Sequence, residues 1–238
     1  MDPKLGNVYT PKSLARQHAL DARRIYNWSG HSKHEYAEIV DLACGDGALL
    51  AAACHWGSDP DRCWGVDQDP VAVEAATYRN SAWVVELGDA LFHPLDQRWD
   101  IALLNPPWIG KVSNRLGSDY ARKVAKRFGP GYNAASDLAA AFILRAAEIS
   151  NQISCIATNT IWQGRTYRSG IKRLLLSGEW AALWHHDPGA KYNGLTVTPT
   201  SRPWPGEAQV HYITFHLVRV SCERYAHWEG GMHHGLSS

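Results

Sequence analysis

The fold class of this chain follows from one segment, Ala37-Glu-Ile-Val-Asp-Leu-Ala-Cys-Gly-Asp-Gly47. Its first part is largely apolar and predicts a strand, Gly45-Asp46-Gly47 predicts a turn, and the Ala- and Leu-rich residues 48–55 predict a helix. Glycines in such a turn let the backbone approach a ligand at the amino end of the helix. The stretch therefore predicts a strand–turn–helix unit with a binding site at its turn.

The same unit recurs along the chain. Short apolar runs predict further strands at residues 62–66, 82–87, 100–104, 153–158 and 180–185. Helical segments are predicted at residues 11–26, 70–80, 134–150 and 169–177, with Thr10, Asp69 and Ser136 as capping residues of the first three. Alternation of strands and helices is typical of a parallel sheet. Residues 208–220 alternate in polarity as a long last strand, and since no helix precedes them, this strand should be antiparallel to its neighbour.

We therefore expect an α/β fold with a seven-stranded, mostly parallel sheet, an antiparallel last strand and helices on both faces. The 238 residues fit one domain, expected over residues 1–225, with a disordered tail at 226–238. The formal net charge of +1 gives no overall nucleic-acid signature. The five cysteines lack CxxC spacing, so neither disulfides nor a metal site is expected. Without a signal segment or the ~20 apolar residues that span a membrane, the chain is expected to be cytoplasmic and not to bind membranes.

Acidic residues follow three successive predicted strands, at Asp41, Asp67 and Asp89. The carboxyl ends of parallel strands meet at one edge of an open α/β sheet. This segment has only two glycines, so it does not match the dinucleotide-binding pattern GxGxxG. The nearby acids Asp41 and Asp46 would also repel a pyrophosphate. They suit a cationic ligand, such as the sulfonium and ammonium groups of S-adenosylmethionine (SAM). Asp67 is then expected at the ribose hydroxyls, with a helix-capping residue as the alternative, and Asp89 at the adenine amino group, with a plain turn aspartate as the alternative.

The tetrapeptide Asn105-Pro-Pro-Trp108 follows the strand predicted at 100–104. Two prolines stop a strand ladder, because proline has no N–H to donate and has a fixed φ. The Asn105 amide oxygen and the Pro106 carbonyl can both accept from a planar NH₂ group, and the Trp108 indole can cover a ring face. The tetrapeptide thus predicts a site for a planar amino group, with a chance strand-end turn as the alternative.

These segments resemble known methyltransferase motifs. Residues 41–47, 65–70, 88–90 and 105–110 are similar to motifs I to IV of class I SAM-dependent methyltransferases, and Asp137-Leu138 with Phe142 is similar to motif V. Tyr9-Thr10-Pro11, ahead of the first strand, resembles motif X of the γ-class DNA adenine-N6 methyltransferases, which predicts a motif X helix over 9–27. The tract from Asn105 to Gly164 and the last strand is similar to the methylase part of fused restriction–modification enzymes.

The resemblance implies methyl transfer from SAM to the N6 amino group of adenine in DNA, with the target base flipped out of the helix. It implies these catalytic residues: Asn105, Pro106, Pro107 and Trp108, where the family more often has Tyr or Phe at position 108. The cofactor-binding residues that it implies are Tyr9, Thr10, Asp41, Ala43, Cys44, Gly45, Gly47, Asp67, Gln68, Asp89, Ala90 and Asn105. No metal is implied.

Two further segments are expected to contact nucleic acid. Residues 110–133 are expected to form a basic substrate loop, and residues 187–206 a long loop near the target pocket. The candidate substrate-binding residues are Lys111, Arg115, Arg122, Lys123, Tyr192 and Trp204. A second basic group comprises Arg165, Arg168, Lys172 and Arg173. A solvated helix face is the alternative for both basic groups.

The sequence shows neither a nuclease segment nor a target-recognition domain, which favours a stand-alone modifying enzyme. Either a specificity subunit or a second copy of the chain is a candidate partner. Two alternatives remain open. One is methylation of another amino group, on an RNA base, cytosine N4 or a release-factor glutamine. The other is a SAM-fold subunit that needs a partner for specificity. Tyr9-Thr10-Pro11 and the basic segment after the tetrapeptide favour DNA adenine.

Overall fold

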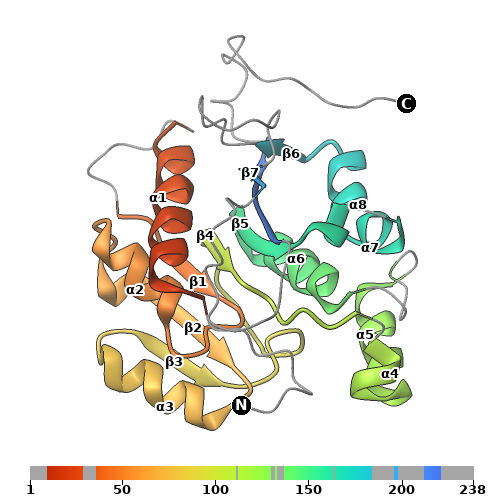
Figure 1. Cartoon of the computed structure of the whole chain (residues 1–238), viewed down its shortest axis with the longest axis horizontal. Helices are drawn as coiled ribbons and strands as arrows, with labels where there is room; N and C mark the ends of the chain where they lie inside the picture. Colours follow the sequence, from red (N-terminus) through yellow and green to blue (C-terminus); the bar gives the residue numbers. More distant parts are fainter. Residues whose placement is uncertain are drawn as a thin grey trace.

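A mixed β-sheet forms the centre of the protein (Figure 1). The computed structural model describes residues 10–28, 36–110, 112–129, 132, 137–162, 164–183, 196–197 and 212–220. The strands are β1 (Ile39–Asp41), β2 (Cys63–Asp67), β3 (Val84–Leu87), β4 (Trp99–Leu104), β5 (Ser150–Thr158), β6 (Trp180–Leu183), β7 (Thr196–Val197) and β8 (Tyr212–Arg219). Their order in the sheet is β3-β2-β1-β4-β5-β8-β6, and β7 pairs with β8.

Strands β1 to β5 pair in parallel, and β8 pairs antiparallel with both β5 and β6. This arrangement confirms the predicted sheet and its antiparallel last strand. β6 and β7 occupy successive parts of the same edge of β8, because Leu183 lies opposite His216 and Thr196 opposite Thr214. β7 is the strand that the sequence did not predict.

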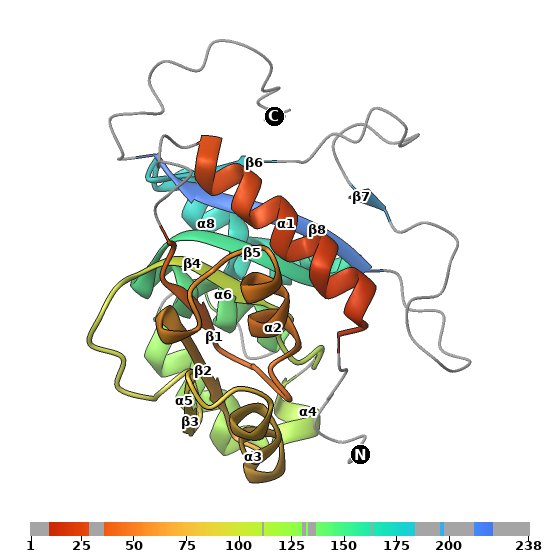
Figure 2. The same cartoon turned by 90° about the vertical axis from the view of Figure 1, so that its left-hand side faces the viewer.

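The helices are α1 (Lys12–Trp28), α2 (Ala48–His55), α3 (Pro70–Arg79), α4 (Val112–Leu116), α5 (Ser118–Phe128), α6 (Leu138–Ile149), α7 (Gly164–Ser169) and α8 (Ile171–Leu176), with 3-10 turns η2 (Pro60–Arg62) and η3 (Asn159–Trp162). Figures 1 and 2 show α1 and α2 on one face of the sheet and α6 and α8 on the other. Successive residues of a strand face opposite sides. In β4, Ile101 and Leu103 accordingly pack into the cluster under α1 and α2, and Ala102 and Leu104 into the cluster under α6.

Helix starts show where local sequence is decisive. Asp69 caps α3 by accepting a hydrogen bond from the Val71 N–H (3.0 Å), and Pro70 follows in the first turn, as predicted. The prediction for α6 was wrong, because Asp137 and not Ser136 is its N-cap, and the Asp137 side chain accepts from the Ala139 N–H (3.0 Å).

The segment expected as a basic loop over 110–133 contains two helices, α4 and α5. Ala121, Val124 and Phe128 of α5 are buried, and this spacing places them on one helical face. The expectation of a loop was wrong because the many charged residues of the outer face obscured three apolar residues.

The helix predicted at 169–177 is confirmed as α8, and α7, which ends at Ser169, is a further helix that the sequence did not predict. A Cβ at Gly170 would lie 3.2 Å from the Cβ of Ala140, so the backbone at Gly170 approaches α6 closely. Apart from β7, the predicted 187–206 loop and the 226–238 tail lie outside the described residues. Among the described helices, none has both the length and the apolarity to cross a membrane.

Candidate active site

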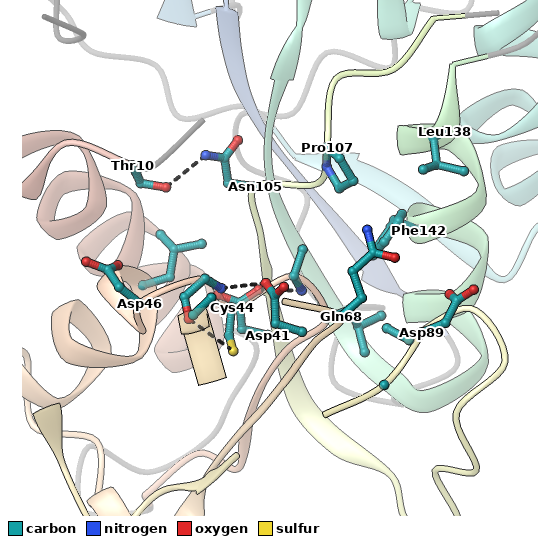
Figure 3. Close-up of a pocket in the computed structure, with 18 of the residues that line it drawn as sticks. Thr10, Asp41, Cys44, Asp46, Gln68, Asp89, Asn105, Pro107, Leu138 and Phe142 are labelled. Atoms are coloured by element: carbon teal, nitrogen blue, oxygen red, sulfur yellow. Dashed lines mark hydrogen bonds between the residues drawn. The ribbon is translucent and has the colours of Figure 1, made fainter. Parts of the chain in front are cut away.

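A pocket opens at the carboxyl ends of β1 to β4 (Figure 3). β1 lies between β2 and β4, so the pocket is at the point where the strand order reverses, which is where open α/β sheets bind ligands. The pocket lining includes these predicted cofactor residues: Thr10, Asp41, Ala43, Cys44, Gly45, Asp67, Gln68, Asp89, Ala90 and Asn105. The sequence prediction thus brought together residues from five separate parts of the chain.

Gly47 is not part of the pocket lining. It is buried, has φ +79°, and a Cβ at this position would lie 2.5 Å from the Trp83 ring. Its glycine is therefore required by a left-handed turn and by close packing against Trp83. Gly45, with φ +53°, lines the pocket.

Asp41 is the buried acid of the pocket, 1% exposed at the end of β1. One carboxylate oxygen accepts from the Ala43 N–H at 3.1 Å. The pKa of Asp41 is raised to about 8, mainly by burial and in smaller part by the negative charges of Asp67 and Asp46, while the Ala43 hydrogen bond opposes the shift. A positive charge in the pocket would favour the ionised carboxylate.

Asp67 and Asp46 are already engaged by protein groups. Asp67 Oδ2 accepts from the Gly45 N–H (2.8 Å) and Oδ1 from the Asp69 N–H (3.0 Å), so this side chain ties the glycine turn to the end of β2. Asp46 forms a 2.6 Å ion pair with Arg79 of α3. Asp67 lines the pocket with its remaining acceptor capacity, since each carboxylate oxygen has two acceptor sites.

Asp89 follows β3 and is held from two sides. Its Oδ1 accepts from the Leu91 N–H and its Oδ2 from the Tyr120 hydroxyl, both at 3.1 Å. Tyr120 belongs to α5 and lines the pocket, as does Leu116 of α4. The sequence prediction missed both residues because it expected a loop there. Leu138 and Phe142 of α6, from the motif V-like segment, complete this side (Figure 3).

Asn105 is joined to the start of α1. Its Nδ2 donates to Thr10 Oγ1 at 2.8 Å, drawn as a dashed line in Figure 3. The bond assigns the amide nitrogen to the Thr10 side, so Oδ1 lies on the other side of the amide group. Thr10 was predicted as a helix cap and a cofactor residue, and the structure adds this contact with the tetrapeptide.

The rest of the tetrapeptide divides between pocket and core. Pro107 lines the pocket, whereas Pro106 is buried. The Pro107 carbonyl accepts from the Ile109 N–H (3.0 Å), and the Ile109 carbonyl accepts from the Leu138 N–H (2.9 Å), which connects the tetrapeptide to α6. Trp108 is half-buried against the core cluster under α1 and α2 and is not among the residues that line the pocket.

The candidate substrate residues Arg115, Arg122 and Lys123 are exposed on α4 and α5. Arg122 forms an ion pair with Asp119, and the Lys123 ammonium lies 3.8 Å from the centre of the Phe92 ring. The remaining predicted site residues lie outside the described part of the chain: Tyr9, Lys111, Tyr192 and Trp204.

One curated protein with sequence similarity is the type II methyltransferase M.VspI of Vibrio sp. (strain 343). It is 24% identical over 205 residues, which cover 81% of this chain and 46% of that protein. The chain thus spans about half the length of this relative. No family model matches the chain.

Several solved structures share the fold. A putative class I SAM-dependent methyltransferase from Listeria monocytogenes has a TM-score of 0.67 at 13% identity, covering 90% of this chain and 62% of that one. The type IIG restriction endonuclease BpuSI has a TM-score of 0.65 at 18% identity, covering 89% and 25%. A putative RNA methyltransferase from Pyrococcus horikoshii has a TM-score of 0.56 at 18% identity, covering 92% and 91%. The chain therefore has the class I SAM-dependent methyltransferase fold, and its similarity to M.VspI and BpuSI confirms the predicted resemblance to restriction–modification methyltransferases.

Proposed function

We propose that this chain transfers a methyl group from SAM to the N6 amino group of adenine in DNA. One observation carries the proposal: a single pocket joins the strand-end acids Asp41, Asp67 and Asp89 to Asn105 and Pro107 of the tetrapeptide. The acids suit a cationic ligand that carries ribose and adenine groups. The amide suits a planar amino group, so one pocket contains the groups for both reactants.

The fit of SAM rests on Asp41 above all. A buried carboxyl whose pKa is raised to about 8 gains most from a ligand that brings positive charge. Asp67 would accept from the ribose hydroxyls and Asp89 from the adenine amino group, in the order in which β1, β2 and β3 place the three acids. When bound, SAM supplies an activated methyl group.

The chain's own contribution to the transfer would be orientation and hydrogen bonding. The N6 lone pair of adenine is delocalised into the ring. If Asn105 Oδ1 and the Pro106 carbonyl each accept one N6 hydrogen, the nitrogen becomes pyramidal and its lone pair points at the methyl group. The bond from Asn105 Nδ2 to Thr10 supports this role, because it orients the amide. Trp108 would stack on the flipped base after moving from its half-buried position.

DNA would lie along α4 and α5. Arg115 of α4 and both Arg122 and Lys123 of α5 are exposed, and Tyr120 of α5 lines the pocket. Exposed cations beside a reactive site suit phosphate groups. Lys111, Tyr192 and Trp204 complete the proposed contacts. A specificity subunit or a second copy of the chain is proposed to take part in choosing the target.

RNA is the second candidate substrate. The Pyrococcus horikoshii protein, which is described as a putative RNA methyltransferase, matches this chain over nearly the full length of both. Asn-Pro-Pro-aromatic tetrapeptides also suit cytosine N4 and a glutamine amide, because each presents a planar amino group. The labelling experiment described next distinguishes these candidate substrates.

The test is to incubate the purified chain with methyl-labelled SAM and with DNA, RNA or protein, and then to identify the methylated product by mass spectrometry. N6-methyladenine in DNA is the expected product, and genomic DNA of the expression host mapped base by base would give the target sequence. Asn105→Ala should abolish transfer while SAM affinity stays near that of the wild type. The proposal would be contradicted if the methyl label appeared only in RNA or protein. It would also be contradicted if Asn105→Ala kept more than a few per cent of the wild-type activity. SAM binding without transfer to any substrate would favour a subunit that needs a specificity partner.

A further inference from the structure

Tyr120 links α5 directly to an acid of the cofactor pocket. Its hydroxyl donates to Asp89 Oδ2 at 3.1 Å, and the Leu91 N–H donates to Asp89 Oδ1 at the same distance. Tyr120 and Asp89 both line the pocket. The Asp89 carboxylate is thus held at one oxygen by its own turn and at the other by a helix 31 residues further along the chain.

The Tyr120 side chain is half-buried and packed against neighbouring residues. It packs edge-to-face on Phe92, with ring centres 6.2 Å apart and an angle of 79° between the ring planes. The next residue, Ala121, is buried together with Val124 and Phe128, which anchors α5 against the body of the protein. Burial, followed by the nearby negative charge of Asp89, raises the pKa of the Tyr120 hydroxyl, so the phenol remains a hydrogen-bond donor at neutral pH.

The two bonds leave the carboxylate able to accept again, because each of its oxygens has two acceptor sites. They also determine the plane of the carboxylate, and with it the direction from which a further donor can approach. A carboxylate held in this way accepts from an exocyclic amine. It cannot pair with the exocyclic carbonyl of a 6-oxopurine, since two acceptors would then face each other.

We propose that Tyr120 is a positioning residue that orients Asp89 to select the 6-amino group of the cofactor's adenine. The inference rests on the proposed function, because it takes a SAM-type ligand as the occupant of the pocket. It adds a selectivity role for a helix that the cofactor motifs do not include. The role acts through Asp89, so it predicts a change in ligand discrimination as well as a change in affinity.

The test compares two ligands that differ at one position of the purine. S-adenosylhomocysteine carries the 6-amino group, and S-inosylhomocysteine carries a carbonyl there. Titration calorimetry of the full chain should show the wild type binding the adenosyl ligand at least about 100-fold more tightly. Tyr120→Phe keeps the ring and removes only the hydroxyl. It should weaken binding of the adenosyl ligand about tenfold and leave binding of the inosyl ligand nearly unchanged. The ratio of the two affinities, adenosyl over inosyl, should therefore fall about tenfold.

Two further variants sharpen the test. Tyr78→Phe is the matched control, because Tyr78 is 93% exposed on α3 and should leave the ratio unchanged. Asp89→Asn should reduce the ratio at least as strongly as Tyr120→Phe, and combining the two should reduce it no further, because the hydroxyl acts through the carboxylate. Thermal unfolding of each variant is measured alongside the titrations, to check that each variant is folded.

The outcomes are distinct. If Tyr120→Phe keeps the wild-type ratio of adenosyl to inosyl affinity, or loses affinity for both ligands equally, the inference is overturned. The proposed function is not affected by either result. Additive effects of Tyr120→Phe and Asp89→Asn would overturn it as well. Failure of the wild type to bind S-adenosylhomocysteine would instead contradict the proposed function itself.

Discussion

The side-chain amide of Asn105 donates a 2.8 Å hydrogen bond to the hydroxyl of Thr10, 95 positions earlier in the chain. The bond joins the segment before α1 to the end of β4. It also determines on which side of the amide group the oxygen lies. A proposed catalytic group at the end of a sheet strand is thereby oriented by a residue at the start of a helix.

Thr10→Val should lower kcat for methyl transfer about tenfold, because the amide loses the partner that orients it. SAM affinity should change by less than about threefold. Steady-state kinetics with a SAM titration measure both quantities, and Thr10→Ser should restore most of the loss. Thr77→Val on the exposed side of α3 is the control. An unchanged kcat in Thr10→Val would mean that Thr10 does not orient Asn105.

Cofactor affinity should depend on pH through Asp41. With its pKa raised to about 8, the carboxyl is protonated below that pH in the ligand-free protein, and a cationic ligand favours the ionised form. Binding should therefore release a proton, with affinity rising up to about tenfold per pH unit from pH 6 to 8 and levelling above. Calorimetry in buffers of different ionisation enthalpy measures the proton release. Asp41→Asn should bind weakly with no such pH dependence, and a flat wild-type profile would count against the role.

The same carboxyl should make the ligand-free protein less stable as pH rises. Its pKa is raised on folding, so its contribution is fully present below the unfolded pKa near 4 and is lost as pH rises toward about 8. The loss is at most about 1.4 kcal/mol per pH unit over that window. Thermal unfolding from pH 5 to 8 should show the stability of the wild type falling relative to Asp41→Asn. Parallel curves for the two proteins would contradict this prediction.

Gly47→Ala should destabilise the fold more than Gly178→Ala. Both glycines have left-handed φ, +79° and +75°, so each substitution carries a backbone cost of about 1 kcal/mol. Only at Gly47 would the new Cβ overlap another group, because Trp83 would be 2.5 Å away while nothing lies within 4 Å at Gly178. Urea unfolding should give a total loss of about 3 kcal/mol for Gly47→Ala. Equal losses for the two variants would show that the Trp83 contact relaxes.

Arg115→Ala and Arg122→Ala should weaken DNA binding with little dependence on sequence. Each lost phosphate contact reduces the slope of log affinity against log salt by about 0.9. Fluorescence anisotropy across a salt series measures the slope, and SAM affinity should stay unchanged. Arg62→Ala is the control, because Arg62 belongs to η2 and not to α4 or α5, and pairs with Glu38. Wild-type salt slopes in both variants would exclude α4 and α5 as the DNA surface.

The predictable parts of this fold are those with a local cause. Asp69 and Pro70 begin α3 through one turn's hydrogen bonding and one fixed φ, and both effects are visible in the sequence. The acids of the pocket follow apolar runs, and sheet topology then brings them together. Choosing between Ser136 and Asp137 as the cap of α6 needs the position of the helix relative to the sheet, since both side chains can cap.

The unpredicted parts depend on contacts between distant residues. The Tyr120–Asp89 hydrogen bond exists because α5 packs next to the turn after β3. The helix was not predicted because most residues of its outer face are charged. The half-buried position of Trp108 likewise follows from the packing of helices α1 and α2 on the sheet, which the tetrapeptide alone does not specify. The spacing of Ala121, Val124 and Phe128 was the signal that could have found α5.

Helix α5 places Tyr120 in the lining of the pocket and Arg122 in solvent, and the two residues are only two positions apart. Ligands on its two sides would therefore act on one rigid body. Thermodynamic linkage is reciprocal, so a nucleic acid that alters the position of α5 must change SAM affinity by the same factor by which SAM changes nucleic-acid affinity. Within the proposed function, the position of α5 therefore makes positive or negative cooperativity between the two substrates, and with it an order of binding, a measurable property of this enzyme.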